Sequence, residues 1–355
     1  MEFYTLTLRE IRRETPECVS LLFDVPESLS DAFRFIPGQY LTLRTTLDGQ
    51  DVRRSYSICS APHEGALRVA VKHLEGGLFS TYANQQLRVG DSLEVMPPQG
   101  RFVVPGDRLN NGLFVAFVAG SGITPVISMI KSVLQDTPGA RFVLFYGNKG
   151  FDHIIFRDTL EILKNAFPDR LSVHHIFSRE SMSNDLFQGH IDAEKCRSFA
   201  RHFFRPTEVD TFFLCGPEEM VLDLKVALGE MEVAPERVKM ELFTTSGSAQ
   251  RSAAPRQSGV PAMEASVTVI QDGVPLEFRL PSDGSVLLDA AMRAGADLPF
   301  SCKGGVCSTC KAKVLQGEVS MDINYGLEPD EVAAGYILTC QAHPKTEKVV
   351  ISFDE

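Results

Sequence analysis

Apolar and polar residues alternate in short runs along the first hundred residues of the chain. The runs "YTLTLREI", "VSLLFDV", "QYLTLRT", "RSYSICS", "ALRVAVKHL" and "DSLEVMPP" place apolar side chains at about every second position, which is the period of a strand with one buried face. Turn residues separate them, at Pro37-Gly38, Asp48-Gly49, Gly65 and Gly90-Asp91. The pattern predicts an antiparallel β-barrel over residues 1–104, with one short helix at about 79–87.

The pattern changes from about residue 112. "GLFVAFVAG" is a continuous apolar run, as in a strand that is buried on both faces. Further strands are predicted at "RFVLFYGN", "LSVHHIFS" and "DTFFLCGP", with helices between or after them at about 124–136, 156–167, 192–203 and 217–230. Strand and helix alternate, so residues 112–243 are predicted to form a doubly wound α/β domain with a parallel sheet.

A linker separates this domain from a third unit. Residues 244–262, "TTSGSAQRSAAPRQSGVPA", contain no acidic and no aromatic residue and have the composition of a flexible linker. Residues 263–355 begin with two predicted strands, "SVTVIQDG" and "LEFRLP", followed by a helix at about 286–294 and a loop rich in cysteine.

Composition narrows the class of protein. The chain has 355 residues, of which 44% are hydrophobic and 23% charged, as in ordinary globular proteins. Its net charge of −11 disfavours a nucleic-acid partner, because phosphate binding needs a basic surface. The N-terminus lacks the apolar run of a signal peptide and no segment is long enough to span a membrane. We therefore expect a cytoplasmic protein, in which clustered cysteines more often bind metal or do redox chemistry than form disulfides.

The cysteine loop carries the most specific signal. "SCKGGVCSTC" begins at residue 301 and spaces its thiols as C-x4-C-x2-C, with a fourth cysteine after 29 further residues. This is the plant-type [2Fe-2S] spacing, although structural zinc and disulfides are alternatives. Gly304 and Gly305 would let backbone N–H groups approach the sulfurs. Residues 263–355 resemble a plant-type ferredoxin, an α+β (β-grasp) domain, and the resemblance implies four ligands: Cys302, Cys307, Cys310 and Cys340.

The barrel carries a second motif, "RRSYSICS". Alone it describes an ordinary edge strand. It lies, however, between "PGQY" (37–40) and "GGLFSTYA" (76–83), and that order resembles the ferredoxin–NADP reductase family. The resemblance implies that Arg54 binds the FAD pyrophosphate, Tyr56 lies against the isoalloxazine and Ser57 hydrogen-bonds near flavin N5. It further implies a pyrophosphate site at the N-terminus of a helix that begins after Gly76. There Gly77 and Ser80 would offer backbone N–H groups to the phosphates.

The same resemblance assigns a nicotinamide nucleotide site in the α/β domain. "AGSGITP" follows the first buried strand and lacks both the lysine of a Walker loop and the third glycine of G-x-G-x-x-G. The residues implied to surround the nucleotide and flavin are Gly120, Gly122, Thr124, Cys215, Gly216, Pro217, Glu241 and Phe243. Ser57, Thr124, Cys215 and Glu241 would be the catalytic ones. A buried structural cysteine and a plain core phenylalanine are the alternatives for Cys215 and Phe243.

Ser178 and Arg179, in "FSRE", match residues that bind the 2′-phosphate, so NADPH is preferred over NADH. A solvated arginine is the alternative. Three other cysteines, Cys18, Cys59 and Cys196, fit no ligand pattern and are interpreted as structural thiols.

The order of the three domains resembles the reductase components of bacterial multicomponent oxygenases. The resemblance covers the whole chain and implies electron transfer from NADPH to FAD, then to the [2Fe-2S] cluster, then to a di-iron oxygenase partner. A reductase of the steroid 9α-hydroxylase type and a general ferredoxin reductase remain alternatives, as does an iron–sulfur redox sensor. Residues 263–355 carry 14 acidic and 7 basic residues, a net −7, which favours a partner surface of basic character.

Overall fold

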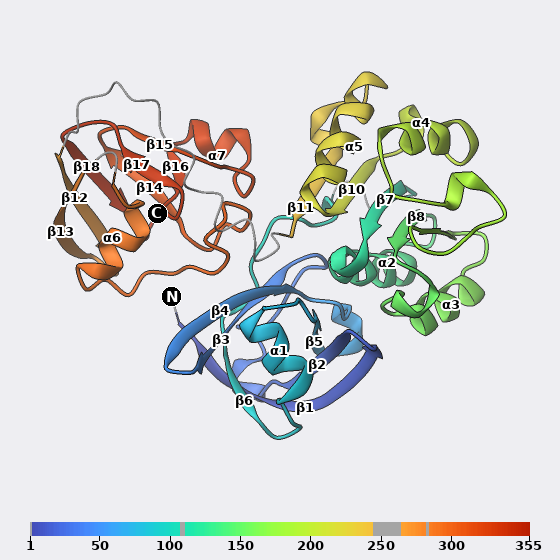
Figure 1. The fold of residues 1–355 in the computed structure, drawn as a ribbon, viewed down its shortest axis with the longest axis horizontal. Helices are drawn as coiled ribbons and strands as arrows, with labels where there is room; N and C mark the ends of the chain where they lie inside the picture. Colours follow the sequence, from blue (N-terminus) through green and yellow to red (C-terminus); the bar gives the residue numbers. More distant parts are fainter. Residues whose placement is uncertain (1, 107–110, 244–263, 282–283) are drawn as a thin grey trace. The chain divides into compact units, whose positions relative to one another are not determined.

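The computed structural model describes residues 2–106, 111–243, 264–281 and 284–355 (Figure 1). The chain divides into two compact units, Glu2–Phe243 and a second one within Thr244–Glu355. The linker predicted at residues 244–262 lies outside the described residues.

The first part of Glu2–Phe243 is an antiparallel barrel, as predicted. Its strands are β1 (Tyr4–Thr15), β2 (Cys18–Asp24), β3 (Tyr40–Leu47), β4 (Gln50–Ser57), β5 (Leu67–Lys72) and β6 (Ser92–Val95). They lie in the order β4-β3-β6-β1-β2-β5, and every neighbouring pair is antiparallel. A bridge between Ile58 and Val69 joins the two outer strands, which closes the sheet. Alternate apolar side chains such as Leu6, Leu8 and Leu41 fill the interior.

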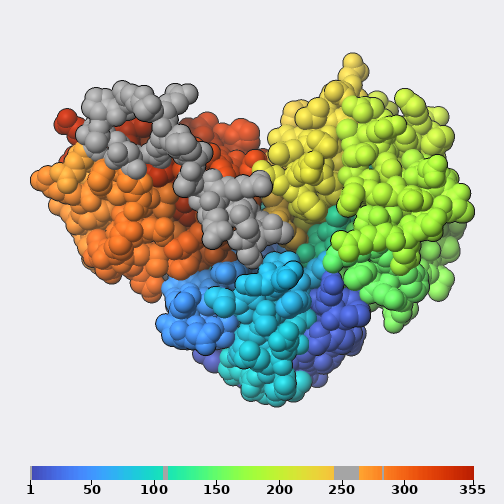
Figure 2. Space-filling view, in the orientation of Figure 1, coloured from blue at the N-terminus to red at the C-terminus, as the bar shows by residue number. Residues whose placement is uncertain are grey.

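One helix, α1 (Leu78–Gln85), packs on the barrel. It buries Phe79, Ser80 and Ala83, while Leu78 is 46% exposed. The segment around α1 forms part of the barrel surface in the space-filling view (Figure 2). The helix therefore presents its N-terminal end to the outside, where a ligand can reach it.

The second part of Glu2–Phe243 is the predicted parallel α/β sheet. Its strands are β7 (Leu113–Ala119), β8 (Arg141–Asn148), β9 (Leu171–Phe177), β10 (Thr211–Gly216) and β11 (Val238–Leu242), in the order β11-β10-β7-β8-β9 and all parallel. The helices are α2 (Ile123–Asp136), α3 (Arg157–Ala166), α4 (Ala193–His202) and α5 (Glu218–Glu230). The strand order reverses between β7 and β10, and ligands bind such sheets at this switch point, beyond the carboxyl ends of the strands.

The C-terminal unit contains a mixed five-stranded sheet in the order β13-β12-β18-β14-β16. Its elements are β12 (Glu264–Gln271), β13 (Val274–Pro281), α6 (Leu287–Arg293), β14 (Lys311–Gln316), α7 (Pro329–Ala333), β16 (Tyr336–Leu338) and β18 (Lys348–Ser352). A separate pair of strands is formed by β15 (Val319–Met321) and β17 (Ala342–Pro344). The cysteine loop lies between α6 and β14, and Cys340 lies between β16 and β17, so the fold brings two distant cysteine segments to one end of the sheet.

Candidate functional site

The barrel motif lies at the end of β4. Tyr56 and Arg54 are two residues apart and so share a face of the strand. The Tyr56 ring packs against Phe79 of α1, with ring centroids 5.4 Å apart, and burial raises the pKa of the Tyr56 hydroxyl above its usual value. Arg54 is exposed and donates from Nη1 to the carbonyl of Arg53 at 2.7 Å. An aromatic face beside an exposed cation suits a flat ring that is linked to phosphate.

The N-terminus of α1 corrects one detail of the predicted phosphate site. The N–H of Gly77 donates to the carbonyl of Leu74 at 3.0 Å, so it is used in a turn and is not offered to a ligand, contrary to the prediction. The first hydrogen bond of the helix runs from Thr81 N–H to Gly77 O. The amides of Leu78, Phe79 and Ser80 precede it and are therefore the donors at this end. The Ser80 amide is among these donors, and its binding of a phosphate stays a prediction.

Gly77 has a steric role in place of the predicted one. A Cβ at this position would lie 2.5 Å from the hydroxyl of Ser80. That hydroxyl in turn accepts from Leu74 N–H at 3.1 Å, which ties the helix to the preceding turn. Gly76 has φ +73°, a left-handed conformation that glycine adopts at no steric cost. These two glycines let the chain turn sharply into α1, and the uncapped helix end fits a bound pyrophosphate.

The glycine loop lies at the switch point between β7 and β10. Gly120–Gly122 forms a short 3-10 turn, η4, and the carbonyl of Gly120 accepts from the Tyr146 hydroxyl at 3.0 Å. A Cβ on Gly122 would lie 2.2 Å from the carbonyl oxygen of Cys215, so only glycine lets the loop approach β10 this closely. Thr124 follows at the start of α2, 3% exposed, and its hydroxyl donates to Ser121 O at 3.0 Å.

Cys215 and Glu241 are neighbours at the ends of β10 and β11, paired in register. Cys215 is fully buried, and burial together with the Glu241 carboxylate raises the pKa of its thiol well above the usual value. Glu241 is half-buried, and desolvation raises its pKa to about 7. Its Oε2 accepts from the hydroxyl of Ser57 at 3.1 Å. The structure thus brings Ser57 of the barrel, Cys215 and Glu241 to one place, where both a flavin and a nicotinamide could meet them.

Phe243, which directly follows β11, is fixed to the end of β10. The N–H of Phe243 points to the carbonyl of Gly216 at 3.5 Å, and Pro217 precedes the first turn of α5. Phe243 is half-buried and packs against the core of the α/β domain. This packing agrees with a core role as well as with a flavin contact.

Sequence reasoning missed Lys72, the last residue of β5. It is half-buried, and burial lowers the pKa of its ammonium group. A Cβ built on Gly120 would lie 3.3 Å from Lys72 Nζ, so this cation stands directly at the glycine loop. A lysine at this place can attract the phosphates of a nucleotide. The signal in the sequence was a lysine ending a barrel strand just before "HLEGG".

Ser178 and Arg179 follow β9 at the same edge of the sheet. Their backbone N–H groups donate to the carbonyls of Asn148 and Lys149, at 3.0 and 2.9 Å, which anchors this turn to the end of β8. Ser178 is half-buried and Arg179 is exposed. A hydroxyl and a guanidinium on a fixed turn can bind a phosphate monoester, although the exposure of Arg179 equally fits a solvated arginine.

The cysteine loop surrounds the sulfur of Cys302 with donors. The N–H groups of Gly304 and Cys307 point to Cys302 Sγ at 3.3 and 3.4 Å, and the Cys307 thiol lies 3.1 Å from it. Hydrogen bonds from the thiols of Cys307 and Cys340 lower the pKa of Cys302 well below its usual value, with help from the two amides. The prediction that glycine would bring amides to the sulfurs is thus confirmed at Gly304.

The two residues that flank Cys340 tie it to the loop. Thr339 donates to the carbonyl of Cys310 from both its N–H and its hydroxyl, at 3.2 and 3.0 Å, and Gln341 Nε2 donates to Lys303 O at 2.9 Å. Gly305, with φ +74°, forms a turn whose carbonyl accepts from the N–H groups of Tyr325 and Gly326, both at 2.9 Å. All four cysteines are unbridged thiols, and this donor set fits a [2Fe-2S] cluster.

Across the described ranges, no three of the His, Cys, Asp and Glu side chains converge as ligands of a single metal ion. A binuclear cluster with four cysteines does not require such convergence, because each of the two iron atoms takes only two of the thiolates. Cys18, Cys59 and Cys196 are buried elsewhere, and burial raises the pKa of the Cys59 and Cys196 thiols to about 12, as suits structural cysteines.

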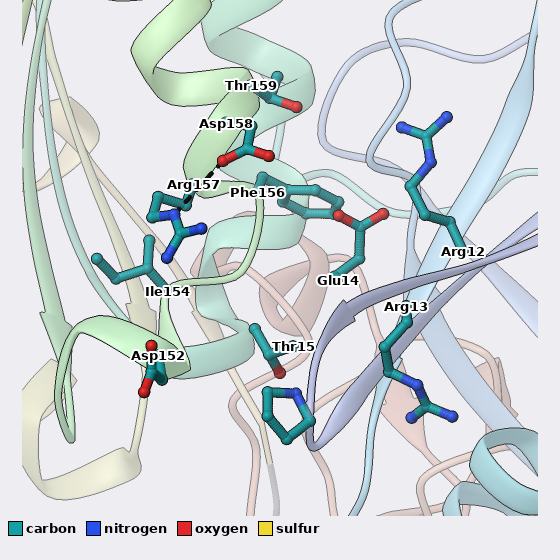
Figure 3. Close-up of a pocket in the computed structure, with 11 residues that line it drawn as sticks. Arg12, Arg13, Glu14, Thr15, Asp152, Ile154, Phe156, Arg157, Asp158 and Thr159 are labelled. Atoms are coloured by element: carbon teal, nitrogen blue, oxygen red, sulfur yellow. Dashed lines mark hydrogen bonds and ion pairs between the residues drawn. The ribbon is translucent and has the colours of Figure 1, made fainter.

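A cavity of about 300 Å³ lies apart from these groups, between the β1–β2 turn and the start of α3 (Figure 3). Several of its charged side chains already have partners. Arg13 donates to Asn84 at 3.0 Å, Glu14 accepts from Ser20 at 2.6 Å, and Arg157 lies 3.4 Å from its neighbour Asp158. The residues that line it include none of the predicted site residues.

Comparisons with known proteins agree with the three-domain organisation. The family described as "Oxidoreductase FAD-binding domain" matches residues 5–104, "Oxidoreductase NAD-binding domain" matches residues 117–225, and "2Fe-2S iron-sulfur cluster binding domain" matches residues 269–345. Helices of the kind that could cross a membrane were not found in the described part of the chain.

Relatives match over the full length. A subunit of 1,2-phenylacetyl-CoA epoxidase from Escherichia coli (strain K12) is 45% identical over 99% of this chain and 98% of its own length. The ferredoxin reductase component of 3-ketosteroid-9-alpha-monooxygenase from Rhodococcus rhodochrous is 36% identical over 98% and 96%.

The solved structure of phthalate dioxygenase reductase is 21% identical and covers 99% of this chain and 98% of its own, with a TM-score of 0.60, so it supports the fold. The chain therefore belongs to the ferredoxin–NADP reductase family of flavoprotein oxidoreductases, in the group that carries a C-terminal [2Fe-2S] domain.

Proposed function

We propose that this protein is the reductase component of a phenylacetyl-CoA epoxidase, and that it passes electrons from NADPH to a di-iron oxygenase in the cytoplasm. The observation that carries the proposal is the 45% identity to a subunit of that epoxidase over 99% of the chain. The sequence supports the same partner, because "YGLEPDEVAAGY" and its surroundings resemble the epoxidase reductase more than the reductases of steroid hydroxylation.

The flavin site is assigned to the barrel and α1. Arg54 binds the FAD pyrophosphate together with the amides of Leu78, Phe79 and Ser80, which precede the first hydrogen bond of α1. Tyr56 lies against the ring system, and Phe79 behind it fixes its plane. Phe243 is assigned to the same ring. FAD bound here would supply the chemistry that accepts an electron pair from a nicotinamide and yields the electrons one at a time.

The nucleotide site is assigned to the switch point. Gly120 and Gly122 give the dinucleotide access to the backbone, with Gly216 and Pro217 on the facing strand end, and Lys72 attracts its phosphates. Ser178 and Arg179 hold the 2′-phosphate, which favours NADPH over NADH. Thr124 and Cys215 face the nicotinamide. Because burial keeps the Cys215 thiol protonated by raising its pKa, it offers a small uncharged surface against a ring that must approach the flavin closely.

Glu241 orients the hydroxyl of Ser57, which lies at the flavin site. Its Oε2 holds the hydroxyl of Ser57 at 3.1 Å, and this contact links the barrel to β11. With a pKa of about 7, Glu241 can hold or release a proton near working pH, so that the site need not keep a permanent negative charge beside the reacting rings.

The C-terminal domain passes the electrons on. Cys302, Cys307, Cys310 and Cys340 hold the cluster, and amides of Gly304 and Cys307 stabilise the charge on Cys302. The net charge of −7 over residues 263–355 supports docking to a partner surface with basic character, and the encounter would weaken as salt screens it.

Purified holo-protein mixed with the oxygenase subunits of phenylacetyl-CoA epoxidase tests the assignment. We expect NADPH consumption that rises when phenylacetyl-CoA is added, together with a ring-epoxidised product. Reduction of dye acceptors without transfer to that oxygenase would reject the assignment and retain the reductase chemistry. The oxygenase of steroid 9α-hydroxylation would then be the next partner to try, since its reductase is 36% identical. A redox sensor would show no sustained NADPH turnover with any acceptor.

A further inference from the structure

One face of α2 connects the two cofactor sites of the unit Glu2–Phe243. Thr124, Ser128 and Lys131 follow one another at intervals of four and three residues, so they share a stripe of the helix. Thr124 begins the stripe at the glycine loop. The other two contact the barrel loop of residues 58–65, which follows directly after Ser57 at the end of β4.

Both contacts are directional, and that of Ser128 is shielded from water. Ser128 is fully buried, and its hydroxyl donates to the carbonyl of Ser60 at 2.6 Å. The ammonium group of Lys131 pairs with Glu64 at 3.0 Å and donates to the carbonyl of Cys59 at 3.4 Å. The side chains of Lys131 and Glu64 are 16% and 35% exposed, so the pair is shielded mainly on the lysine side.

Hydrogen bonds within the barrel hold this loop in place, so it can transmit a position. Glu64 also accepts from the N–H of Ala61 at 2.6 Å, and the hydroxyl of Ser60 donates to Ala66 O at 2.7 Å. The N–H of Cys59 donates to Arg68 O at 2.8 Å. A loop held at these points cannot follow α2 freely, so a shift of α2 would have to break the contacts of Ser128 and Lys131 with the loop.

A second boundary between the barrel and the α/β domain has longer polar contacts. There the cavity of about 300 Å³ separates the β1–β2 turn from the start of α3 (Figure 3). Glu17 lies 3.6 Å from both Lys149 and His153, with side chains about one-third exposed. Apolar burial at the interface is non-directional and does not fix an angle by itself. The hydrogen-bonded contacts of α2, together with the hydrogen bond between Ser57 and Glu241, are therefore suited to set the angle between the two domains.

We propose that Ser128 and Lys131 are positioning residues for hydride transfer. They fix α2, and with it the loop from Gly120 to Thr124, at the distance from β4 of the barrel that lets the nicotinamide ring lie on the flavin. The proposal rests on the proposed function. It predicts that loosening α2 slows the step between nicotinamide and flavin, with little effect on nucleotide affinity, because the binding residues at the glycine loop stay in place.

The test compares Ser128→Ala and Lys131→Met with matched controls. Ser132→Ala removes a buried hydroxyl one turn further along α2 that has no hydrogen-bond partner among the described residues. Lys164→Met removes an ion pair within α3, at 3.7 Å. Lys131→Arg keeps the charge opposite Glu64 and should restore the wild-type rate. Oxidised holo-protein is mixed with NADPH under anaerobic conditions in a stopped-flow instrument. Absorbance then gives the rate of flavin reduction and the intensity of the nicotinamide–flavin charge-transfer band.

We expect Ser128→Ala and Lys131→Met to reduce flavin at roughly one-tenth of the wild-type rate at saturating NADPH, since small displacements cost large factors at a reacting pair. The charge-transfer band should weaken, and the Kd for NADPH should stay within about twofold. Both controls should match wild type. Wild-type rates in both variants would overturn the proposal, as would an equal slowing of electron transfer from chemically reduced flavin to the cluster. If the wild-type protein itself is not reduced by NADPH or NADH, the proposed function fails instead.

Discussion

Replacing Gly122 by alanine tests the close approach between the glycine loop and β10. The added Cβ would lie 2.2 Å from the carbonyl oxygen of Cys215 and 2.7 Å from its carbonyl carbon, where ordinary contact begins at 3.4 Å. The loop and the strand would have to separate by about 1.2 Å, the difference between 3.4 and 2.2 Å. The opposing atoms are backbone, and Cys215 is paired on both sides, with Val118 and Glu241, so the strand cannot move aside easily.

The consequence for the reaction follows from the size of that displacement. A misplacement of about 1 Å at a reacting pair can cost about 100-fold in rate, which corresponds to about 2.7 kcal/mol in the activation barrier. We therefore expect Gly122→Ala to slow flavin reduction at saturating NADPH roughly 100-fold. Overpacking should also lower the free energy of unfolding by about 1–3 kcal/mol.

The assay is anaerobic stopped-flow reduction of the flavin, with thermal denaturation as the check on folding. Gly229→Ala in α5 is the matched control, because a Cβ there would meet no atom of the described residues within 4 Å. This control should keep the wild-type rate and gain up to about 1 kcal/mol in helix stability. A folded Gly122→Ala protein that reduces its flavin at the wild-type rate would refute the reasoning, since the nucleotide loop would then tolerate the displacement.

Three further predictions concern Glu241, the cluster ligand Cys302 and the nucleotide-binding residue Arg179. Because the pKa of Glu241 is raised from 4.5 to about 7, the folded protein binds this proton more tightly than the unfolded chain, and its free energy of unfolding falls as pH rises through that window. The Tm advantage of Glu241→Gln over wild type should thus be larger at pH 8 than at pH 5, and a constant difference would contradict the shift. Cys302→Ser should abolish the visible absorbance of the cluster and transfer to the oxygenase, while NADPH-driven dye reduction persists; an intact cluster spectrum would exclude Cys302 as a ligand. Arg179→Ala should raise the KM for NADPH about tenfold, as expected for a lost charged hydrogen bond, and leave the KM for NADH unchanged, whereas equal effects on both would reject the 2′-phosphate role.

The fold was largely predictable because its elements have strong periodicity. The predicted helices at 79–87, 124–136 and 286–294 correspond to α1, α2 and α6, which end within two residues of the expected positions. The buried run "LFVAFVA" forms β7. The short elements around the cysteine loop, α7, β15 and β17, have three to five residues each, too few for a periodic pattern to develop.

The site was predictable where a motif is local and not where it depends on distant contacts. The thiol spacing is contained in one loop plus Cys340, and it predicted the four cysteines that the fold brings together. The hydrogen bond between Ser57 and Glu241 joins residues 184 positions apart, and no local pattern announces it. The use of the Gly77 amide in a turn, and the approach of Lys72 to Gly120, likewise depend on how the β5–α1 connection folds.

The central claim is that electrons pass from NADPH through the flavin to the cluster within this chain. The most direct measurement is anaerobic mixing of the holo-protein with NADPH, with flavin absorbance and the electron paramagnetic resonance of the reduced cluster followed in time. The account predicts that the flavin bleaches first and that the cluster signal rises afterwards, at a rate independent of protein concentration. A cluster that stays oxidised while the flavin is fully reduced, or a transfer rate that grows with protein concentration, would contradict it.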